Sequence, residues 1–143
     1  MYKYEIKRPT IDELQSFLYI TKDDFCPSLD LRVNIEEYTY KLYSNAMFVI
    51  CRHVTAIVGI ICCYQNRPPI GYISHVGVLK SHRQKGIMRN LFLMLFENAG
   101  KNSIKELRLE VNNQNNVAIN AYKTMGFIDY KNEDNSLYMR CKL

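Results

Sequence analysis

The chain opens with apolar side chains that alternate with charged ones, and then changes to helical spacing. In residues 2–7, tyrosine or isoleucine alternates with lysine or glutamate, which is the period of a strand with one buried face. Thr10 then begins a capping-box pattern with the glutamate three residues later, followed by apolar residues at helical spacing. Asn34 repeats this capping pattern, so a second helix is expected at about residues 35–43.

Two apolar runs rich in β-branched residues occupy the middle of the chain. Residues 46–51 and 56–64 predict a hairpin joined near His53. A third strand is expected at residues 71–78, after a turn that contains two prolines. The following residues, 84–98, have inward apolar positions at helical spacing and a glycine just beyond their end, which predicts a helix.

The last third of the chain predicts three more strands and a short helix. A strand is expected at residues 104–111, a helix at 116–125, and two final strands at 127–131 and 137–142 around an asparagine-rich turn. Strands that alternate with helices in this order indicate a mixed α/β sheet with helical crossovers. One domain covering residues 1–143 is expected, because this length fits a single compact core.

Composition narrows the class of protein. The chain is 48% hydrophobic and 23% charged, as in an ordinary globular protein, and its net charge is +5. The basic residues are scattered, which suits an anionic ligand better than a nucleic acid, so no nucleic-acid partner is expected. Five cysteines, an odd number without metal-ligand spacing, predict reduced thiols and no bound metal.

The start of the chain has no apolar core of a signal peptide, and no stretch approaches the roughly 18 apolar residues that span a bilayer. No membrane partner is therefore expected, and the cytoplasm is the simplest location. An exposed sheet edge near the C-terminus would permit a homodimer.

The segment at residues 78–88 lies between a predicted strand and a predicted helix. Such a junction directs several unpaired backbone N–H groups and the positive end of the helix dipole at one point, which favours phosphate groups. Gly86 lets the backbone approach a ligand closely. Lys80, His82, Arg83 and Lys85 add positive charge. An ordinary basic helix start with a turn glycine is the alternative interpretation.

A second candidate segment spans residues 109–127. It combines the end of a strand, an asparagine-rich loop, a short helix that carries Tyr122, and a glycine that ends this helix. Asparagines of this kind also serve as helix caps and turn residues, and a tyrosine can simply pack in the core. Each feature alone therefore has a structural explanation.

Taken together, the two segments resemble the GCN5-related N-acetyltransferase (GNAT) superfamily. Residues 83–88, Arg-Gln-Lys-Gly-Ile-Met, resemble its pyrophosphate loop, and the second motif is matched in order and spacing by Glu110, Asn115, Ala118, Tyr122, Gly126 and Phe127. The resemblance implies a mostly antiparallel central sheet with two splayed strands and about four helices. Met88 departs from the pattern, because the family usually has glycine or alanine there; we expect cofactor binding to survive with altered packing.

The resemblance also implies acetyl-coenzyme A as cosubstrate, with its pantetheine arm between the strands at residues 73–78 and 107–111. Backbone groups of the first strand would bind the arm, those of the loop would bind the pyrophosphate, and an asparagine side chain would contact the arm. The residues expected to bind the cofactor are Val76, Val78, Arg83, Gln84, Lys85, Gly86, Ile87, Met88, Asn115, Ala118 and Tyr122.

Catalysis in this family is direct attack of an amine on the thioester. Tyr122 matches the family's general acid, and Glu110 resembles the glutamate of the branch that acetylates ribosomal proteins. Alternation places Glu110 on the opposite face of its strand from Leu109 and Val111. His75 is a rival base, because its ordinary pKa lies near neutrality, and a water chain would need no dedicated base. A structural carboxylate and a packed histidine remain the alternatives.

The acceptor is expected to be a primary amine of a small molecule, an amino sugar or a peptide. An acyltransferase for longer acyl chains and a non-catalytic acyl-coenzyme A sensor stay open as alternatives. The acidic residues between the first two helices could attract a cationic amine or be merely solvated, and nearby tyrosines could line a pocket or complete helix faces. The acidic residues are Asp23, Asp24 and Asp30, and the tyrosines are Tyr19, Tyr38, Tyr40 and Tyr43.

Overall fold

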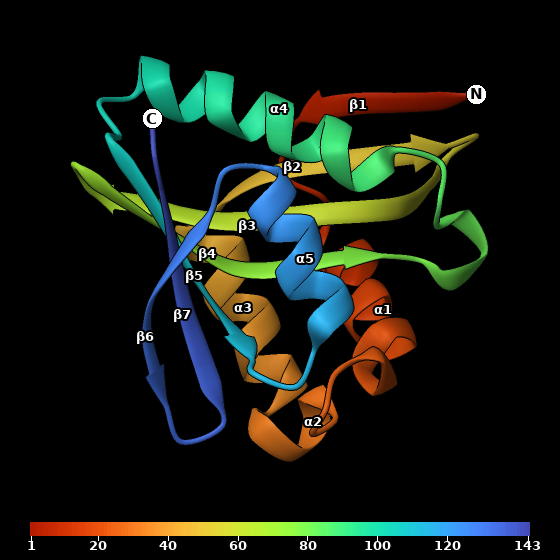
Figure 1. Cartoon of the computed structure of the whole chain (residues 1–143). Helices are drawn as coiled ribbons and strands as arrows, with labels where there is room; N and C mark the ends of the chain where they lie inside the picture. The colour runs from red at the N-terminus through yellow and green to blue at the C-terminus, as the bar shows by residue number, and fades with distance from the viewer.

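In a computed structural model, which describes all 143 residues, the chain forms one seven-stranded sheet flanked by helices (Figure 1). The strand order is β1-β2-β3-β4-β5-β7-β6, and every neighbouring pair is antiparallel except β4 and β5. The strands are β1 (Tyr2–Ile6), β2 (Met47–His53), β3 (Ala56–Arg67), β4 (Ile70–Val78), β5 (Glu106–Asn112), β6 (Ile128–Glu133) and β7 (Ser136–Lys142).

Helices cover both faces of this sheet. α4 and α5 lie on the near face in Figure 1, whereas α1, α2 and α3 lie on the other side. The helices are α1 (Ile11–Thr21), α2 (Leu29–Arg32), α3 (Ile35–Asn45), α4 (Ile87–Lys101) and α5 (Asn116–Thr124), with short 3₁₀ turns at Lys22–Asp24 and Lys80–His82.

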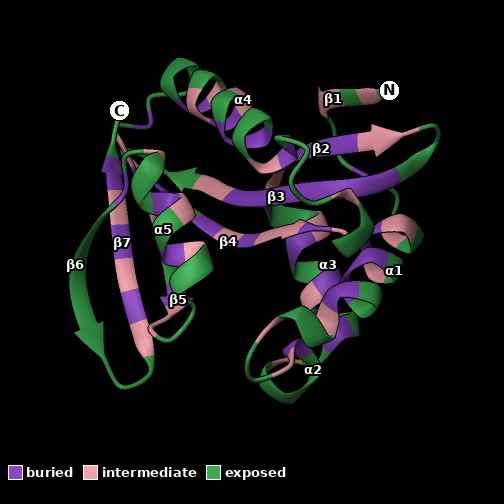
Figure 2. Cartoon of the chain, turned by 45° about the vertical axis from the view of Figure 1, so that its right-hand side comes forward, coloured by how far each residue is buried: buried purple, intermediate pink, exposed green.

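Each side of the sheet has its own hydrophobic core, because successive side chains of a strand point to opposite faces. On β2, Val49 and Cys51 pack in the core beneath α4 and α5, whereas Phe48 and Ile50 pack in the core with α1 and α3. The middle strands are therefore buried along most of their length, and β6 is exposed throughout (Figure 2).

The sheet opens between its two parallel strands. β4 pairs with β5 only from Ile70 opposite Glu106 to Ile73 opposite Leu109. Beyond that point β4 continues to Val78 while still paired with β3, and β5 continues while paired with β7. The two strands therefore diverge, and backbone groups on their facing edges are left without strand partners.

The predicted mixed α/β sheet and the order of its elements are confirmed, with differences in several bounds. Both predicted N-caps are present, since Thr10 and Asn34 accept hydrogen bonds from the N3 backbone N–H groups of α1 and α3. A fifth helix, α2, was not expected. The helix predicted from Gln84 begins at Ile87 instead, because Gln84 and Gly86 adopt left-handed φ angles of 61° and 77°. The same helix runs through Gly100 to Lys101, so the glycine expected beyond its end does not stop it. The strand predicted from residue 104 begins at Glu106.

None of the helices combines the length and the apolar character that crossing a bilayer requires.

Candidate active site

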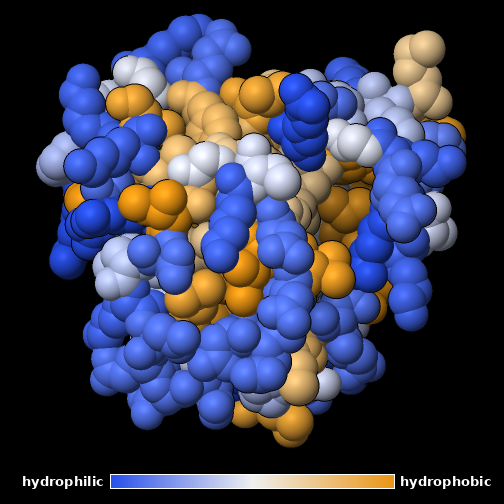
Figure 3. All heavy atoms as spheres, in the orientation of Figure 1, coloured by the Kyte–Doolittle hydropathy of each residue, from blue (hydrophilic) through white to orange (hydrophobic).

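A cavity of about 920 Å³ lies where β4 and β5 diverge. Its wall includes the splayed parts of β4 and β5, the loop before α4, one side of α5, and the segment that connects α1 to α3. Figure 3 shows hydrophobic side chains in the middle of the face that carries α4 and α5, surrounded by hydrophilic ones. The cavity therefore joins an apolar interior to a polar rim, as ligand sites usually do.

The start of α4 forms one end of this cavity. Gly86 occupies the N-cap position with φ 77° and ψ 11°, no side chain caps the helix, and its first turn contains no acidic residue. A methyl group added to Gly86 would meet nothing within 4 Å, so space is open beside the backbone. The first N–H groups of a helix have no intrahelical partners, so those of α4 are available to bind an anion.

Arg83 ties this loop to its surroundings. Its Nε donates a hydrogen bond to the Val78 carbonyl oxygen at 3.2 Å, and its Nη2 lies 2.8 Å from an Asp24 carboxylate oxygen. The hydrogen bond of Arg83 therefore connects the loop to the end of β4, and its ion pair connects the loop to the segment after α1. Gln84 and Arg83 line the cavity, whereas Lys85 does not.

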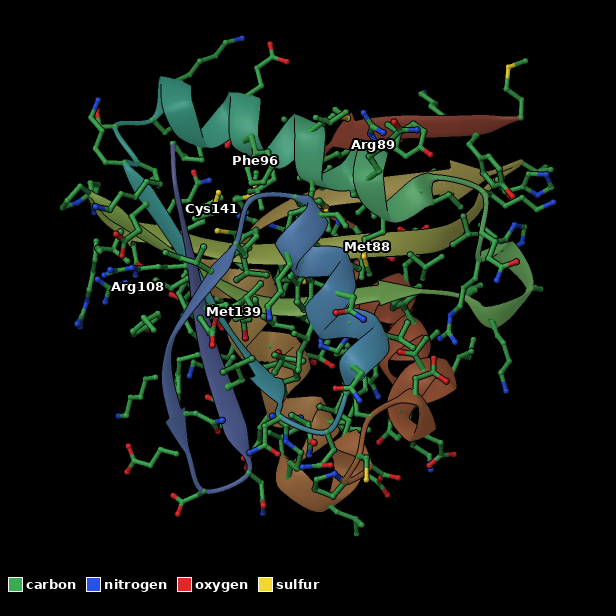
Figure 4. The ribbon with its side chains drawn as sticks, in the orientation of Figure 1. Met88, Arg89, Phe96, Arg108, Met139 and Cys141 are labelled. Carbon is green, nitrogen blue, oxygen red and sulfur yellow. The ribbon has the colours of Figure 1, made fainter.

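Met88 lies between the first turn of α4 and the side of α5 (Figure 4). It packs partly buried against the core and lines two spaces, the cavity at the split and a smaller groove of about 430 Å³ between α4 and α5. Ile87 is buried beneath it. The methionine side chain therefore fills space between the two helices, while its backbone N–H belongs to the open helix start.

Asn115 acts as the N-cap of α5. Its Oδ1 accepts a hydrogen bond of 3.2 Å from the Ala118 backbone N–H. Both residues line the cavity. The Nδ2 group of Asn115 makes no hydrogen bond within the chain, whereas its oxygen stabilises the helix.

Tyr122 lies on the side of α5 that faces the sheet, and only 8% of its surface is exposed. Its ring packs edge-on against Phe92 and Phe127, with centroids 5.9 and 6.1 Å away. Burial alone raises the pKa of Tyr122 to about 12. Because Tyr122 also lines the cavity, it presents a hydroxyl that stays protonated at neutral pH.

Glu110 extends from β5 on the exposed face, while Leu109 and Val111 are buried on the other. The alternation predicted for this strand is confirmed. A Glu110 carboxylate oxygen accepts a hydrogen bond of 2.5 Å from the Ser136 hydroxyl of β7. Glu110 lines the cavity from β5.

His75 belongs to β4 and is 4% exposed. Its ring contacts Phe25 and Tyr38, with centroids 5.1 and 5.9 Å away, and its Nε2 has no hydrogen-bond partner. Burial, with a smaller contribution from the charge of Arg32, lowers the pKa of His75 to about 4. The imidazole is therefore neutral at pH 7 and a weak proton acceptor.

The acidic residues that might have attracted a cation are engaged elsewhere. Asp24 pairs with Arg83, while Asp23 and Asp30 lie 3.4 and 4.0 Å from the Lys22 ammonium. Among the tyrosines of this region, only Tyr38 lines the cavity. Its hydroxyl is 3.0 Å from the Ser74 carbonyl oxygen and 2.9 Å from the Ser74 hydroxyl.

Comparison with known proteins agrees with this geometry. Residues 11–127 match the model of the acetyltransferase (GNAT) family. The chain belongs to this family. It is accordingly an acyl-coenzyme A-dependent N-acetyltransferase, as the two segments at residues 83–88 and 109–127 indicated.

Solved structures with the GNAT fold cover the chain almost completely. A protein from Pyrococcus horikoshii has a TM-score of 0.84 at 21% identity and covers 100% of this chain and 99% of its own. The PaiA N-acetyltransferase of Thermoplasma acidophilum, solved with coenzyme A, has a TM-score of 0.77 at 18% identity, with 99% of each chain covered. The ribosomal-protein-alanine N-acetyltransferase of Brucella melitensis has a TM-score of 0.76 at 20% identity, covering 97% of this chain and 99% of its own. A sequence comparison with curated proteins gave no match.

Sequence reasoning missed two charged residues of this GNAT site, Arg89 in the first turn of α4 and Arg32. Arg32, the last residue of α2, lines the cavity beside β4. No motif marked it, because α2 has only four residues and gives no periodic signal. The neighbouring Asn112, whose Nδ2 donates to the Cys26 carbonyl oxygen at 2.9 Å, also anchors this segment to β5 without any sequence signal.

Proposed function

We propose that this chain transfers the acetyl group of acetyl-coenzyme A to a primary amine of a small molecule, an amino sugar or a peptide. The observation that carries the proposal is the divergence of β4 and β5 after Ile73 and Leu109. Tyr122, Glu110 and His75 all line the cavity that this divergence opens, next to the uncapped start of α4.

The residues at the split fit the cosubstrate. The facing edges of β4 and β5 offer unpaired backbone groups to the amides of a pantetheine arm, with Val76 and Val78 on the β4 side. Backbone N–H groups from Gln84 to Met88 would bind the pyrophosphate, because that loop combines two left-handed residues with a helix N-terminus. Ala118 and the Nδ2 group of Asn115 line the opposite wall.

In the proposed reaction, the amine nitrogen of the acceptor attacks the thioester carbonyl carbon, the carbon–sulfur bond breaks, and the amine loses a proton. Tyr122 donates its hydroxyl proton to the departing thiolate and recovers a proton from solvent. Its raised pKa keeps that proton in place until the sulfur becomes negative. The rings of Phe92 and Phe127 pack edge-on against the Tyr122 ring and hold it in place.

Glu110 is the proposed base. It is an exposed carboxylate on the cavity wall and is oriented by the Ser136 hydroxyl. His75 is a poorer candidate, because it is only 4% exposed and its ring is packed against Phe25 and Tyr38. Glu110, in contrast, is exposed on the cavity wall. Relay of the proton through water is the alternative. Full activity of a Glu110→Gln variant would favour this relay.

One neighbour by fold supports a peptide acceptor within this range. It is a ribosomal-protein-alanine N-acetyltransferase, so peptide amines belong in the test beside small-molecule amines.

The test is a thiol-release screen with acetyl-coenzyme A. The amines should include polyamines, aminoglycosides, amino acids, amino sugars and N-terminal peptides. Amine-dependent thiol release, lowered in Glu110→Gln, is the expected result. Tight coenzyme A binding without release for any amine would instead favour a non-catalytic acyl-coenzyme A sensor, and release only with longer acyl thioesters would favour the longer-chain alternative.

A further inference from the structure

The charges that line the cavity are not all neutralised. Five residues with full charges contribute to its wall: Asp24, Arg32, Arg83, Arg89 and Glu110. Asp24 and Arg83 neutralise each other at 2.8 Å, and Arg89 belongs to the first turn of α4, at the end of the cavity proposed for phosphate. The half of the cavity left for the acceptor therefore has one anion, Glu110, and one cation, Arg32.

Arg32 has no protein partner. No carboxylate lies within ion-pairing distance of its guanidinium, and it makes no side-chain hydrogen bond, whereas the adjacent Asp30 is directed toward Lys22 at 4.0 Å. The helix that carries it is held in place, since Leu29 of α2 is only 3% exposed and packs with α1 and α3. Arg32 itself is exposed, and an arginine that lines a cavity without a carboxylate partner is available for a ligand.

Arg32 and the β4 residues Tyr72 and His75 line the same cavity. The positive charge of Arg32 is among the causes that lower the pKa of His75 and that oppose the rise in the pKa of Tyr72. The charge of Glu110 acts on the same Tyr72 hydroxyl and raises its pKa. Arg32, Tyr72 and Glu110 all line one cavity, and neither charge is neutralised by an oppositely charged side chain.

We propose that the acceptor amine carries an oxyanion, a carboxylate or a phosphate, that Arg32 binds while Glu110 faces the ammonium. Arginine suits this task, because its planar fork of N–H donors matches the paired oxygens of either group. This inference rests on the proposed acetyl transfer and narrows its acceptor to an amine that is zwitterionic, such as an amino acid or a phosphorylated amino alcohol.

Matched pairs of amines test the inference in the thiol-release assay. Phenylalanine is compared with phenethylamine, ornithine with putrescine, and phosphoethanolamine with ethanolamine; the first two pairs isolate the carboxylate and the third isolates the phosphate. The native chain should prefer the anionic member of at least one pair by about tenfold to a hundredfold in kcat/KM, as charge-assisted hydrogen bonds of this kind allow.

Arg32→Gln should abolish this preference by raising KM for the anionic amine, with kcat and the rate for the neutral partner little changed. Arg32→Lys should restore part of it, because lysine keeps the charge and loses the fork. Arg67→Gln is the control, since Arg67 is an exposed arginine at the end of β3 that does not line the cavity. Equal use of both members, or an equal loss for both in Arg32→Gln, would overturn the inference.

Thermal unfolding without cofactor separates this inference from the proposed function. The anionic amines should raise the Tm of the native chain and of Arg67→Gln, but not of Arg32→Gln. A rise in Tm without any turnover would refute acetyl transfer to these amines and keep the oxyanion site. Turnover of neutral amines with no dependence on Arg32 would refute the oxyanion site and keep acetyl transfer, and neither effect would refute both.

Discussion

At the scale of single residues, the hydroxyl of Tyr122 can be removed without disturbing the ring that holds it. Tyr122→Phe keeps the edge-on contacts with Phe92 and Phe127, so the fold should be unchanged. We expect kcat to fall by about a hundredfold or more, the usual contribution of a general acid, with little change in KM for acetyl-coenzyme A. Steady-state thiol release and circular dichroism measure the two effects.

Tyr40→Phe is the matched control for this variant. Tyr40 is a tyrosine on α3 that is 56% exposed and does not line the cavity, so the loss of its hydroxyl should leave turnover intact. A native kcat in Tyr122→Phe would rule out Tyr122 as the general acid. The thiolate would then leave without a proton from this hydroxyl.

His75 predicts how stability depends on pH. Its pKa is about 4 in the folded chain, against 6.5 as its ordinary value. Between these values the unfolded chain binds a proton that the folded chain excludes, so stability is fully present above pH 6.5 and falls as the pH drops toward 4. The full loss is on the order of 3 kcal/mol. Urea unfolding at pH 7, 6 and 5 measures the slope.

His75→Gln should flatten this slope, whatever its effect at pH 7. Glu13→Gln is the comparison, because the hydrogen bonds from Arg52 lower the pKa of Glu13 to about 2, well below this window. Its variant should alter stability at pH 7 and keep the slope between pH 7 and 5. An unchanged slope in His75→Gln would assign the pH dependence to other groups.

The sequence allowed much of the candidate site to be placed at this scale, since Glu110, His75 and Tyr122 do line one cavity. Two assignments needed coordinates. The side-chain oxygen of Asn115 caps α5, and the spacing of residues in the sequence does not distinguish a capping asparagine from a ligand-binding one. Arg32 reaches the cavity from a four-residue helix, and its position depends on packing between elements far apart in the chain.

At the scale of elements, the periodic strands and the capped helices were predictable, because their patterns are local. The first residue of α4 was not predictable in this way. Helix propensity does not reveal that Gln84 and Gly86 both adopt left-handed φ angles. This geometry turns the chain sharply between Arg83 and Ile87, so that the first N–H groups of α4 face the cavity instead of the end of β4.

Gly86→Ala tests that geometry. Its new methyl group would meet nothing within 4 Å, so any effect comes from forcing alanine to a φ of 77°. We expect a loss of about 1 kcal/mol in the free energy of unfolding and, where the strain is relieved by shifting the loop, about fivefold weaker coenzyme A binding. Urea unfolding and calorimetric titration measure these quantities.

Gly100→Ala provides the control within the same helix. Gly100 also has open space around it but does not have a positive φ, so alanine should be neutral or stabilise α4 by up to about 1 kcal/mol and leave coenzyme A binding unchanged. Equal behaviour of the two variants would mean that the left-handed turn at Gly86 does not position the phosphate loop.

At the scale of the whole molecule, the split of the sheet could not be predicted from periodicity. The alternation in residues 70–78 and 106–112 continues through the point where pairing stops, because each strand keeps its other neighbour, β3 or β7. The split is a tertiary feature, and α5 and the segment around α2 line its opening. Only the resemblance to the GNAT family predicted the split between β4 and β5.

The split also predicts where a bound cosubstrate protects the backbone. Coenzyme A should slow amide hydrogen exchange in residues 74–78 of β4, whose outer edge lacks a strand partner, and in residues 84–88 at the start of α4. Free pantetheine lacks the pyrophosphate, so at saturation it should protect the β4 amides and leave those of α4 unchanged. β1 and β2 pair with each other along the whole of β1 and serve as the internal reference.

Protection at α4 without protection at β4 would place the cofactor on the helix start alone, and the divergence of β4 and β5 would then have another purpose. Protection of both by coenzyme A, and of β4 alone by pantetheine, requires one ligand to bridge the two halves of the sheet, which is the arrangement that brings a thioester to Tyr122.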